Sequence, residues 1–492
     1  MNYDIIIGLE IHVQLQTESK MFSWSGTDFG LPPNTQTDPV SLGLPGTLPV
    51  MNKKAFELAL KTAVALHAEI APFTKWDRKN YYYADLPKNY QISQYDLPFS
   101  RGGHIEVPLR KDGGGGGRCR LTRIHLEEDT GKLMHAAGGY SEVDLNRAGI
   151  PLLEIVTEPD IRSPADARGC LEELRLTLRY LEVSDCEMQE GSLRCDANVN
   201  LHINKDGQTI ATPIVEIKNL NSFRAVEKAL HYEVERQYQK WIEDGKTIKD
   251  APKTTRGWND VEEVTKPQRE KETAADYRYF PEPDLVPVVA DGPWLDRVRA
   301  SIGELPRARR HRFEGDYGLS AYDANVLVEQ GREVADYFDA VARSTKEYKL
   351  ASNWIQQDVL RTIKEKKTTI AEFPVPPETL ADLINRVERK ELNTNQGREV
   401  LGRMIETGEP AATIIAQGGY QMVSDRDTIA AAVAAAVAAN PQALDELKKG
   451  KKKPEAVKGF LRGQVMKQTG GKADPALVGE ILESKLAELQ LG

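Results

Sequence analysis

Residues 5–16 alternate between apolar and polar side chains, and this segment constrains the fold of the chain most strongly. The apolar positions are Ile5, Ile7, Leu9, Ile11, Val13 and Leu15, and the other positions are Gly8, Glu10, His12, Gln14 and Gln16. A period of two over this length predicts a β-strand with one face in the core. The opposite face carries an acid and an imidazole but no lysine, so it suits metal or phosphate chemistry better than simple exposure to solvent.

Four other segments, at 119–129, 151–156, 193–203 and 214–219, have a similar strand-like pattern. Their polar positions include Glu127, Glu128, Glu154, Asp196 and Glu216. Each of these acids, taken alone, is more often a solvated residue than a ligand. Together, acids on several apolar-backed strands repel one another unless cations lie between them. Mg²⁺ accepts carboxylate oxygens, and a histidine ligand favours Mn²⁺, so the pattern leaves a metal site and a solvated face as the two alternatives.

The bulk composition limits the class of protein. A chain of 492 residues with 40% hydrophobic and 28% charged residues predicts a globular protein of several domains. No run of about 18 apolar residues is present, and the N-terminus starts in a strand, so we expect a cytoplasmic protein without a membrane span. The four cysteines show no CxxC pairing, which argues against a disulfide framework. The net charge of −9 argues against non-specific nucleic-acid binding but allows a local basic patch.

Changes in composition divide the chain into three predicted parts. Residues 1–293 are β-rich with inserted helices, residues 294–410 are helical, and residues 411–492 form a small helical tail. The predicted fold class is therefore α+β, with a β-rich N-terminal domain followed by two all-α domains.

Several helix boundaries are marked by capping residues. Ser163, followed by proline, predicts the start of a helix over 163–181. A second helix is predicted from Ser222 to just before Gly245, and an alanine-rich helix over 428–439. These signals place the helices independently of the strand pattern.

Two low-complexity runs admit more than one interpretation. The glycines at 113–117 are typical of a loop tip, because no Lys-Ser/Thr pair and no helix follows them as a phosphate-binding loop requires. A basic run near the C-terminus consists of Lys448, Lys449, Lys451, Lys452 and Lys453, with Lys458 and Arg462 on the next predicted helix. It is either a solvated turn or a contact to nucleic-acid phosphates.

Seven longer motifs resemble one protein family. They are IGLEIHVQL at 7–15, DLPKNYQISQ at 85–94, HLEEDTGK at 125–132, VDLNRAGIPLLE at 143–154, EGSLRCDAN at 190–198, KNLNSF at 218–223 and DYRYFPEPDL at 276–285. Over essentially its whole length the chain resembles the B subunits of the bacterial aspartyl/glutamyl-tRNA(Asn/Gln) amidotransferases. The motifs are long and occur in order, so they are far more specific than any short fingerprint.

The resemblance implies a fold, a reaction and partners. The N-terminal domain would be a cradle related to the glutamine synthetase fold, and the tail would contact tRNA. The side-chain carboxylate of Glu-tRNA(Gln) or Asp-tRNA(Asn) would be phosphorylated by ATP, and ammonia would then displace phosphate to give the amide. Ammonia would come from a glutaminase A subunit, in a heterotrimer completed by a small C subunit. The resemblance therefore implies a ligase of protein biosynthesis.

The resemblance also implies roles for particular residues. His12, Glu128 and Glu154 would hold one divalent cation, and Glu10, Asp196 and Glu216 would hold a second one, with Glu128 shared between them. Parity allows only one of Glu127 and Glu128 on a given strand face, and the motif match selects Glu128. Glu10, His12, Glu128 and Glu154 are thus the expected catalytic set. The candidates for phosphate contacts are Lys88, Arg269, Lys271 and Arg278, each of which could equally be a surface cation.

One departure from the family pattern concerns a zinc knuckle that many members carry near the N-terminus. The matching positions here are Ser23, Ser25, Asp38 and Ser41. None of them is a thiolate, so we expect no zinc. The segment must then be held by packing within the chain.

Two other functions remain open at this level. A ligase that acts on a free small metabolite could use the same metals, but would have no use for the basic tail. A tRNA-binding scaffold without activity is disfavoured by the acids, because bare carboxylates oppose RNA binding. The sequence contains no Ser-Ser-Gly amidase signature, so an ammonia source from glutamine requires a partner.

Overall fold

The computed structural model describes residues 3–107, 116–135, 138–268, 276–418, 420, 425–448 and 453–489. These divide into two compact units, Met1–Pro306 and Arg307–Gly492. The first is rich in β-sheet and the second is helical, which confirms the predicted α+β class. The further division of the helical part at residue 410 stays a prediction, and the glycines at 113–115 lie outside the described residues.

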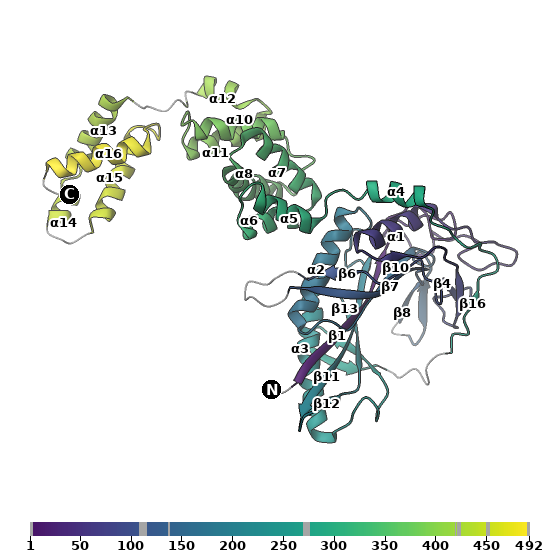
Figure 1. Ribbon diagram of the computed structural model, residues 1–492. Helices are drawn as coiled ribbons and strands as arrows, with labels where there is room; N and C mark the ends of the chain where they lie inside the picture. Colours follow the sequence, from purple (N-terminus) through teal and green to yellow (C-terminus); the bar gives the residue numbers. More distant parts are fainter. Residues whose placement is uncertain are drawn as a thin grey trace. The chain divides into compact units, whose positions relative to one another are not determined.

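The first unit is built on one large sheet, to which the described residues contribute eleven strands (Figure 1). Its order is β15-β14-β13-β11-β1-β10-β7-β5-β2, with β12 paired to β11 and β6 paired to β7. The strands are β1 Tyr3–Gln14, β2 Glu69–Ile70, β5 Ser100–Arg101, β6 His104–Glu106, β7 Arg118–Glu128, β10 Pro151–Thr157, β11 Leu193–Lys205, β12 Gln208–Ala211, β13 Val215–Leu220, β14 Thr254–Asn259 and β15 Val264–Pro267. All five strand-like segments of the sequence are therefore strands of this sheet.

The two faces of the sheet differ as the alternation in the sequence predicts. Ile7, Ile11 and Val13 of β1 are fully buried. They belong to a core that also contains apolar side chains of α1 (Lys53–Ala65), α2 (Pro164–Tyr180) and α3 (Phe223–Asp244). Figure 1 shows α2 and α3 together on one side of the sheet. The polar side chains of β1 consequently lie on the face turned away from this core.

The capping signals place the helices where the sequence predicts them. The Ser163 side chain accepts a hydrogen bond from the Asp166 backbone N–H at the start of α2, and proline occupies the first turn. The Ser222 side chain accepts from the Ala225 N–H at the start of α3, and Gly245, in the left-handed conformation, ends that helix. Each cap satisfies an end group that the helix itself leaves unpaired.

A small three-stranded sheet contacts the C-terminal end of β7. It consists of β16 (Phe280–Pro281), β3 (Asp77–Asn80) and β4 (Tyr90–Ser93), in that order. The Gln91 Nε2 donates to the Glu128 carbonyl at 2.7 Å, and the Ser93 Oγ donates to the Glu127 Oε2 at 3.2 Å. A separate hairpin joins β8 (Lys132–His135) and β9 (Ser141–Asp144).

The four positions that match the zinc knuckle converge on a single carboxylate. The Ser23 and Ser25 hydroxyls both donate to Asp38 Oδ2, the first at 2.7 Å. Ser41 Oγ donates to the same oxygen at 3.1 Å, and the Val40 and Ser41 N–H groups donate to Oδ1 at 2.8 and 2.9 Å. The segment is therefore held by a hydrogen-bonded cluster centred on Asp38, in addition to the packing that the sequence predicted.

Replacing Asp38 by alanine is expected to lower the free energy of unfolding by about 2–3 kcal/mol, since buried hydroxyl and N–H donors lose their acceptor. Chemical denaturation of the purified protein measures this change. Glu18→Ala, an exposed acid nearby, is the control and should change stability by less than about 0.5 kcal/mol. Equal effects of the two substitutions would contradict the role of the cluster.

The same cluster predicts a dependence on pH. Burial raises the pKa of Asp38, but the hydrogen bonds from Ser25, Ser41 and Ser23 lower it more, so it lies below its ordinary value of 3.8. A lowered carboxyl pKa stabilises the folded state at pH values above the unfolded pKa. That contribution is lost as the pH falls below about 4 through the folded pKa.

The second unit contains helices only, among the residues described. Those up to residue 418 are α5 Pro306–Gly315, α6 Ala321–Glu329, α7 Arg332–Thr345, α8 Tyr348–Trp354, a π-helical turn Ile355–Val359, α9 Leu360–Lys366, α10 Pro377–Glu388, α11 Thr394–Thr407 and α12 Ala411–Gly418. They follow α4 Gly292–Ala300, the last helix of the first unit. The tail helices are α13 Arg426–Ala439, α14 Pro441–Lys448, α15 Pro454–Gln468 and α16 Pro475–Glu488. α13, α15 and α16 share an apolar core of their own.

No helix of the described residues combines the length and apolar character that a membrane span requires.

Candidate functional site

The strand register brings acids and imidazoles onto the polar face of the large sheet. His12 of β1 lies directly opposite Glu154 of β10, and Glu154 lies opposite His125 of β7. Glu10 lies opposite Asp196 of β11 on the other side of β1. Because directly opposed residues point to the same face of a sheet, these five side chains form one polar surface.

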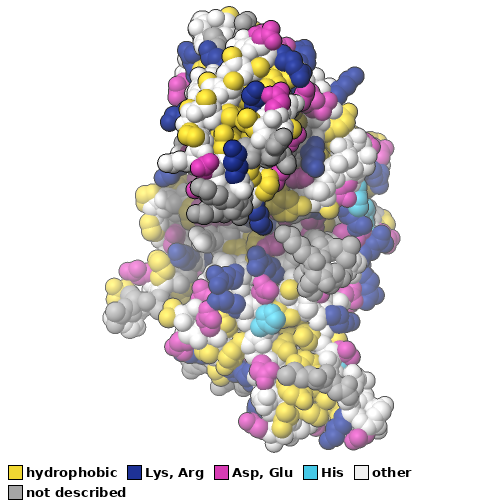
Figure 2. Space-filling model, turned by 90° about the vertical axis from the view of Figure 1, so that its left-hand side faces the viewer, with side chains coloured by type: hydrophobic (Ala, Val, Ile, Leu, Met, Phe, Trp, Pro, Cys, Tyr) yellow, Lys and Arg dark blue, Asp and Glu magenta, His cyan; other side chains and the backbone are white. Residues whose placement is uncertain are grey.

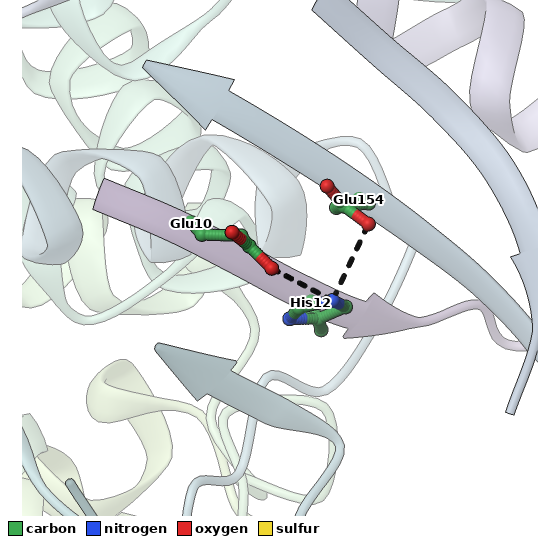
Figure 3. Close-up of side chains that lie close together, drawn as sticks. All are labelled: Glu10, His12 and Glu154. Atoms are coloured by element: carbon green, nitrogen blue, oxygen red, sulfur yellow. Dashed lines mark ion pairs between the residues drawn. The ribbon is translucent and has the colours of Figure 1, made fainter. Parts of the chain in front are cut away.

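Two groups of these side chains lie close enough to share a cation. In the first, His12 Nε2 lies 3.8 Å from Glu10 Oε1 and 3.5 Å from Glu154 Oε2; Figure 3 shows the three side chains converging from β1 and β10. In the second, His125 Nε2 lies 3.3 Å from Glu154 Oε2 and 3.8 Å from Glu127 Oε2. Within each group one ligand atom per residue lies within 4.8 Å of the others, and Glu154 belongs to both.

Burial and the charges of neighbouring side chains shift the pKa values of the residues in this cluster. Burial raises the pKa of Glu154, but the neighbouring His125 and His12 lower it well below its usual range. Burial lowers the pKa of His125, but Glu154 and Glu127 together raise it to about 9. Burial and the charge of Glu154 raise the pKa of Glu10. The neighbouring acids thus act on His125 in the direction that favours its protonated imidazole.

The sequence selected Glu128 from the adjacent pair, whereas the structure places Glu127 in the cluster. Glu127 lies on the same side of β7 as His125, two residues away, and its Oε1 is 3.9 Å from His12 Nε2. The carboxylate of Glu128 accepts hydrogen bonds from Lys88 Nζ and, at 2.9 Å, from the Ile92 N–H. Neighbours on a strand point to opposite faces, so Glu127 and Glu128 lie on different sides of β7, and the role of Glu128 as a cation ligand stays a prediction.

Two of the three residues expected to hold a second cation, Asp196 and Glu216, are ion-paired with lysines. The Lys218 ammonium donates to Asp196 and lies 3.6 Å from Glu216 Oε2. Glu216 also accepts from Lys253 Nζ at 2.9 Å and from Thr255 Oγ1 at 3.1 Å. Among the described residues neither acid joins a group of converging ligands, so the second site stays a prediction.

The four predicted phosphate contacts have different surroundings. Lys88 is ion-paired with Glu128, as described above. Arg278 is exposed and lies 3.3 Å from Asp276. Arg269 and Lys271 lie outside the described residues. Two of the four candidates, Lys88 and Arg278, lie within the described residues. Of these two, only Lys88 contacts another predicted site residue.

The predicted tRNA contacts lie in the tail. Lys448 ends α14, and Lys453 and Arg462 are exposed at the start and in the middle of α15. Lys458 Nζ lies 3.5 Å from both Glu455 and Glu483. Lys449, Lys451 and Lys452 lie outside the described residues. On the face that Figure 2 draws, Lys and Arg side chains are interspersed with Asp and Glu side chains.

Sequence reasoning did not select three residues that lie around the site. His125 and Glu127 share a face of β7, and their spacing of two positions was the signal that could have found them. Tyr279 gave no local signal. Its ring stacks on Tyr95 with 4.1 Å between centroids. Burial, Glu127, Tyr277 and Glu154 all raise its pKa, which places the phenol near the acid cluster.

Comparison with known proteins agrees with the motifs. A model of the GatB/GatE catalytic domain matches residues 5–296, and a model described as the GatB domain matches residues 336–486. An aspartyl/glutamyl-tRNA(Asn/Gln) amidotransferase B subunit from Rhodopirellula baltica is 50% identical over 98% of this chain and 97% of its own length. The B subunit of the same enzyme from Moorella thermoacetica is 48% identical over 99% of this chain and 100% of its own length. The chain therefore belongs to the family of aspartyl/glutamyl-tRNA(Asn/Gln) amidotransferase B subunits.

Proposed function

We propose that this chain uses ATP to phosphorylate the side-chain carboxylate of Glu-tRNA(Gln) or Asp-tRNA(Asn) and then forms the amide with ammonia. A carboxylate has only oxide as a leaving group, so an acyl phosphate must precede attack by ammonia. The single observation that carries the proposal is the convergence of Glu10, His12 and Glu154 on one face of the sheet. The products would be Gln-tRNA(Gln) and Asn-tRNA(Asn) for protein synthesis.

The residues of the cluster fit a divalent cation. Glu10 and Glu154 offer hard oxygen donors and His12 offers a nitrogen donor, a set that suits Mg²⁺ or Mn²⁺. The negative charges of Glu154 and Glu127, which raise the pKa of His125, act in the same direction as this donor set. When bound there, the cation would neutralise the phosphate oxygens of ATP as the phosphoryl group moves.

The side chains of the cluster would each have a distinct task. Glu10, His12 and Glu154 would hold the cation, and His125 would keep Glu154 in place from the other side at 3.3 Å. Glu127, fixed by Ser93 at 3.2 Å, would complete the polar floor of the site. The substrate carboxylate is itself the nucleophile, so the protein needs to position it and exclude water rather than supply a base.

Predicted residues that are now ion-paired could act as proposed only if those pairs open. A second cation at Glu10, Asp196 and Glu216 requires Lys218 to leave the two acids. A role for Glu128 as a ligand requires that it release Lys88, which would then be free to contact phosphate, as would Arg269, Lys271 and Arg278. The acid-bearing sheet face supports the proposed relation of the N-terminal cradle to the glutamine synthetase fold.

The proposal includes partners. A glutaminase A subunit would supply ammonia and a small C subunit would complete a heterotrimer, since the chain has no amidase signature of its own. Trp24, Phe29, Leu48 and Val50 are each more than 60% exposed, and apolar exposure of this kind within one segment is typical of contacts between protein chains. The basic residues of the tail would contact tRNA phosphates.

The purified three-chain complex tests the function. It is expected to amidate Glu-tRNA(Gln) or Asp-tRNA(Asn) with ATP and free ammonia, and the mischarged tRNA should stimulate ATP hydrolysis. Free glutamate and free aspartate are the controls and should not be amidated. Efficient amidation of the free amino acids, without a need for tRNA, would favour a small-molecule ligase instead.

A triple charge reversal, Lys448→Glu with Lys453→Glu and Arg462→Glu, tests the tail. It is expected to raise the KM for tRNA at least about 10-fold at 0.15 M salt, because lost phosphate contacts weaken binding steeply. The KM for ATP should not change. Steady-state amidation with each substrate varied in turn measures both values, and an unchanged KM for tRNA would exclude the tail as a phosphate contact.

A further inference from the structure

Arg123 lies on the polar face of the sheet, beside the acid cluster, but belongs to neither group of converging ligands. It precedes His125 by two positions on β7, so both side chains point to the same face. In the strand register Arg123 lies opposite Val156 of β10, and Val156 lies opposite Glu10 of β1. Two strand spacings, about 10 Å, therefore separate the backbones of β7 and β1. An anion bound at Arg123 would lie beside the cation site rather than on it.

The guanidinium of Arg123 has no partner among the residues that the structure describes. The residue is half-buried, yet no ion pair, hydrogen bond or ring contact joins its side chain to any of them. By contrast, Arg120 of the same strand is paired with Asp160 at 2.8 Å. A partly buried charge without a partner is unfavourable, which makes the guanidinium of Arg123 suited to an anionic ligand.

The neighbouring strand places a second arginine beside Arg123. Arg101 of β5 lies directly opposite Arg123 in the register, and its guanidinium donates to the Asp96 carbonyl at 2.7 Å. Like charges that face each other across two strands destabilise a sheet. Within the described part of the chain no carboxylate forms an ion pair with either guanidinium, so a bound anion would relieve this repulsion.

The phenol of Tyr279 offers a neutral donor in the same region. Burial and nearby acids raise its pKa, and the positive charge of Arg123 opposes them, which places the ring near Arg123 as well as near the acids. No hydrogen bond engages its hydroxyl among the residues described. The ring is held instead by its stack on Tyr95. A protonated phenol held in this way is suited to donate to an oxygen of a ligand.

Hydrogen bonds on both sides fix the chain that carries Tyr279. Asn80 Nδ2 donates to the carbonyl of Arg278, the preceding residue, at 2.8 Å. Arg78 donates through Nε and Nη2 to the two carboxylate oxygens of Glu282, at 2.6 and 2.8 Å. The position of the phenol is therefore set before any ligand binds, which lowers the cost of a contact to it.

We propose that Arg123 and Tyr279 bind the side-chain carboxylate of the mischarged aminoacyl-tRNA. The planar fork of a guanidinium matches the two oxygens of a carboxylate, and the phenol adds a donor to one of them. The inference rests on the proposed function, because it names the residues that hold the reacting group of that substrate. It also provides for product release, since the amide product carries no negative charge to pair with Arg123.

Binding of a mischarged tRNA and of its own amidated form tests this assignment. The three-chain complex, saturated with AMP-PNP and without ammonia, is titrated with Glu-tRNA(Gln) and Gln-tRNA(Gln), or with Asp-tRNA(Asn) and Asn-tRNA(Asn). Filter retention of the radiolabelled amino acid measures binding. We expect Arg123→Gln to weaken binding of the carboxylate form about 10- to 100-fold and to leave that of the amide form within about twofold. Tyr279→Phe, which keeps the ring stack, should weaken the carboxylate form alone, about 3- to 10-fold.

Two further variants control for charge and fold. Arg118→Gln is the matched control, since Arg118 also lies on β7 but is 65% exposed and paired with Glu106 at 3.2 Å. It should leave both affinities unchanged. Arg123→Lys keeps the charge but loses the fork, so it should recover only part of the affinity for the carboxylate form. Thermal melting of each variant verifies the fold.

Three other outcomes would overturn the inference. Equal weakening of both tRNA forms by Arg123→Gln would assign the arginine to a tRNA phosphate. A loss of affinity for AMP-PNP alone, measured by calorimetry, would assign it to ATP, and unchanged binding of the carboxylate form would exclude the contact. Because the assay measures binding without turnover, a carboxylate-specific loss in a complex that fails to amidate tRNA would support the inference and reject the proposed function.

Discussion

Replacing Glu154 by glutamine is expected to lower the rate of ammonia-dependent amidation at least about 100-fold. Glu154 is the one residue shared by both groups of converging ligands, so its loss removes a cation ligand and the partner of two imidazoles. Glutamine has nearly the same size, and the residue is buried on a strand that keeps its pairing. Steady-state amidation with ATP, ammonia and mischarged tRNA measures the effect, and thermal melting verifies the fold.

Two comparisons sharpen this prediction. Glu142→Gln, an exposed acid of the β8–β9 hairpin, is the control and should leave the rate within about twofold of the wild type, the ordinary outcome for a solvated acid. Glu127→Gln should slow the reaction more than Glu128→Gln, because only Glu127 faces His12. The opposite order would favour Glu128 as the ligand, and an active Glu154→Gln variant would reject the cluster as the cation site.

Asp129→Asn is expected to lower the free energy of unfolding by about 3–4 kcal/mol. Asp129 is only 2% exposed. Its Oδ2 accepts from Arg194 at 2.7 Å and from Gln14 at 2.8 Å, and Arg147 lies 3.7 Å away. Removing the charge leaves Arg194 without its partner and weakens the link between β1, β7 and β11. Urea denaturation followed by circular dichroism measures the loss.

Glu172→Gln is the matched control for Asp129. It also breaks an ion pair with arginine, at 2.8 Å from Arg168, but both side chains are more than 40% exposed. Exposed pairs contribute less than about 1 kcal/mol. A loss as large as that of Asp129→Asn would mean that burial does not govern the strength of these pairs in this protein.

Most of the N-terminal architecture follows from short-range patterns in the sequence. Alternation found β1, β7, β10, β11 and β13, because a half-buried strand needs one apolar face. The capping residues Ser163 and Ser222 found the starts of α2 and α3, because the first N–H groups of a helix need acceptors. Alternation does not predict which strands are neighbours. The pairing of β1 with β10 is therefore known only from the structure.

The site was predicted in part for the same reason. Parity assigns a side chain to a face, but choosing between Glu127 and Glu128 requires knowing the strand opposite. The pairing of Lys218 with Asp196 joins neighbouring strands across a bulge in their register, which no local pattern reveals. The hydrogen bonds to Asp38 span up to 15 positions of the chain. A zinc motif, which is defined by thiolates, predicts no zinc here but does not predict this cluster.

The most direct test of the central claim is transfer of the γ-phosphoryl group of ATP to the aminoacyl-tRNA. The wild-type complex is mixed with [γ-³²P]ATP and mischarged tRNA in the absence of ammonia, quenched rapidly and assayed for label bound to tRNA. We expect label on the tRNA with the wild type and none with Glu154→Gln. Equal labelling by both proteins would contradict the account, because the carboxylate would then be activated without the Glu10–His12–Glu154 cluster.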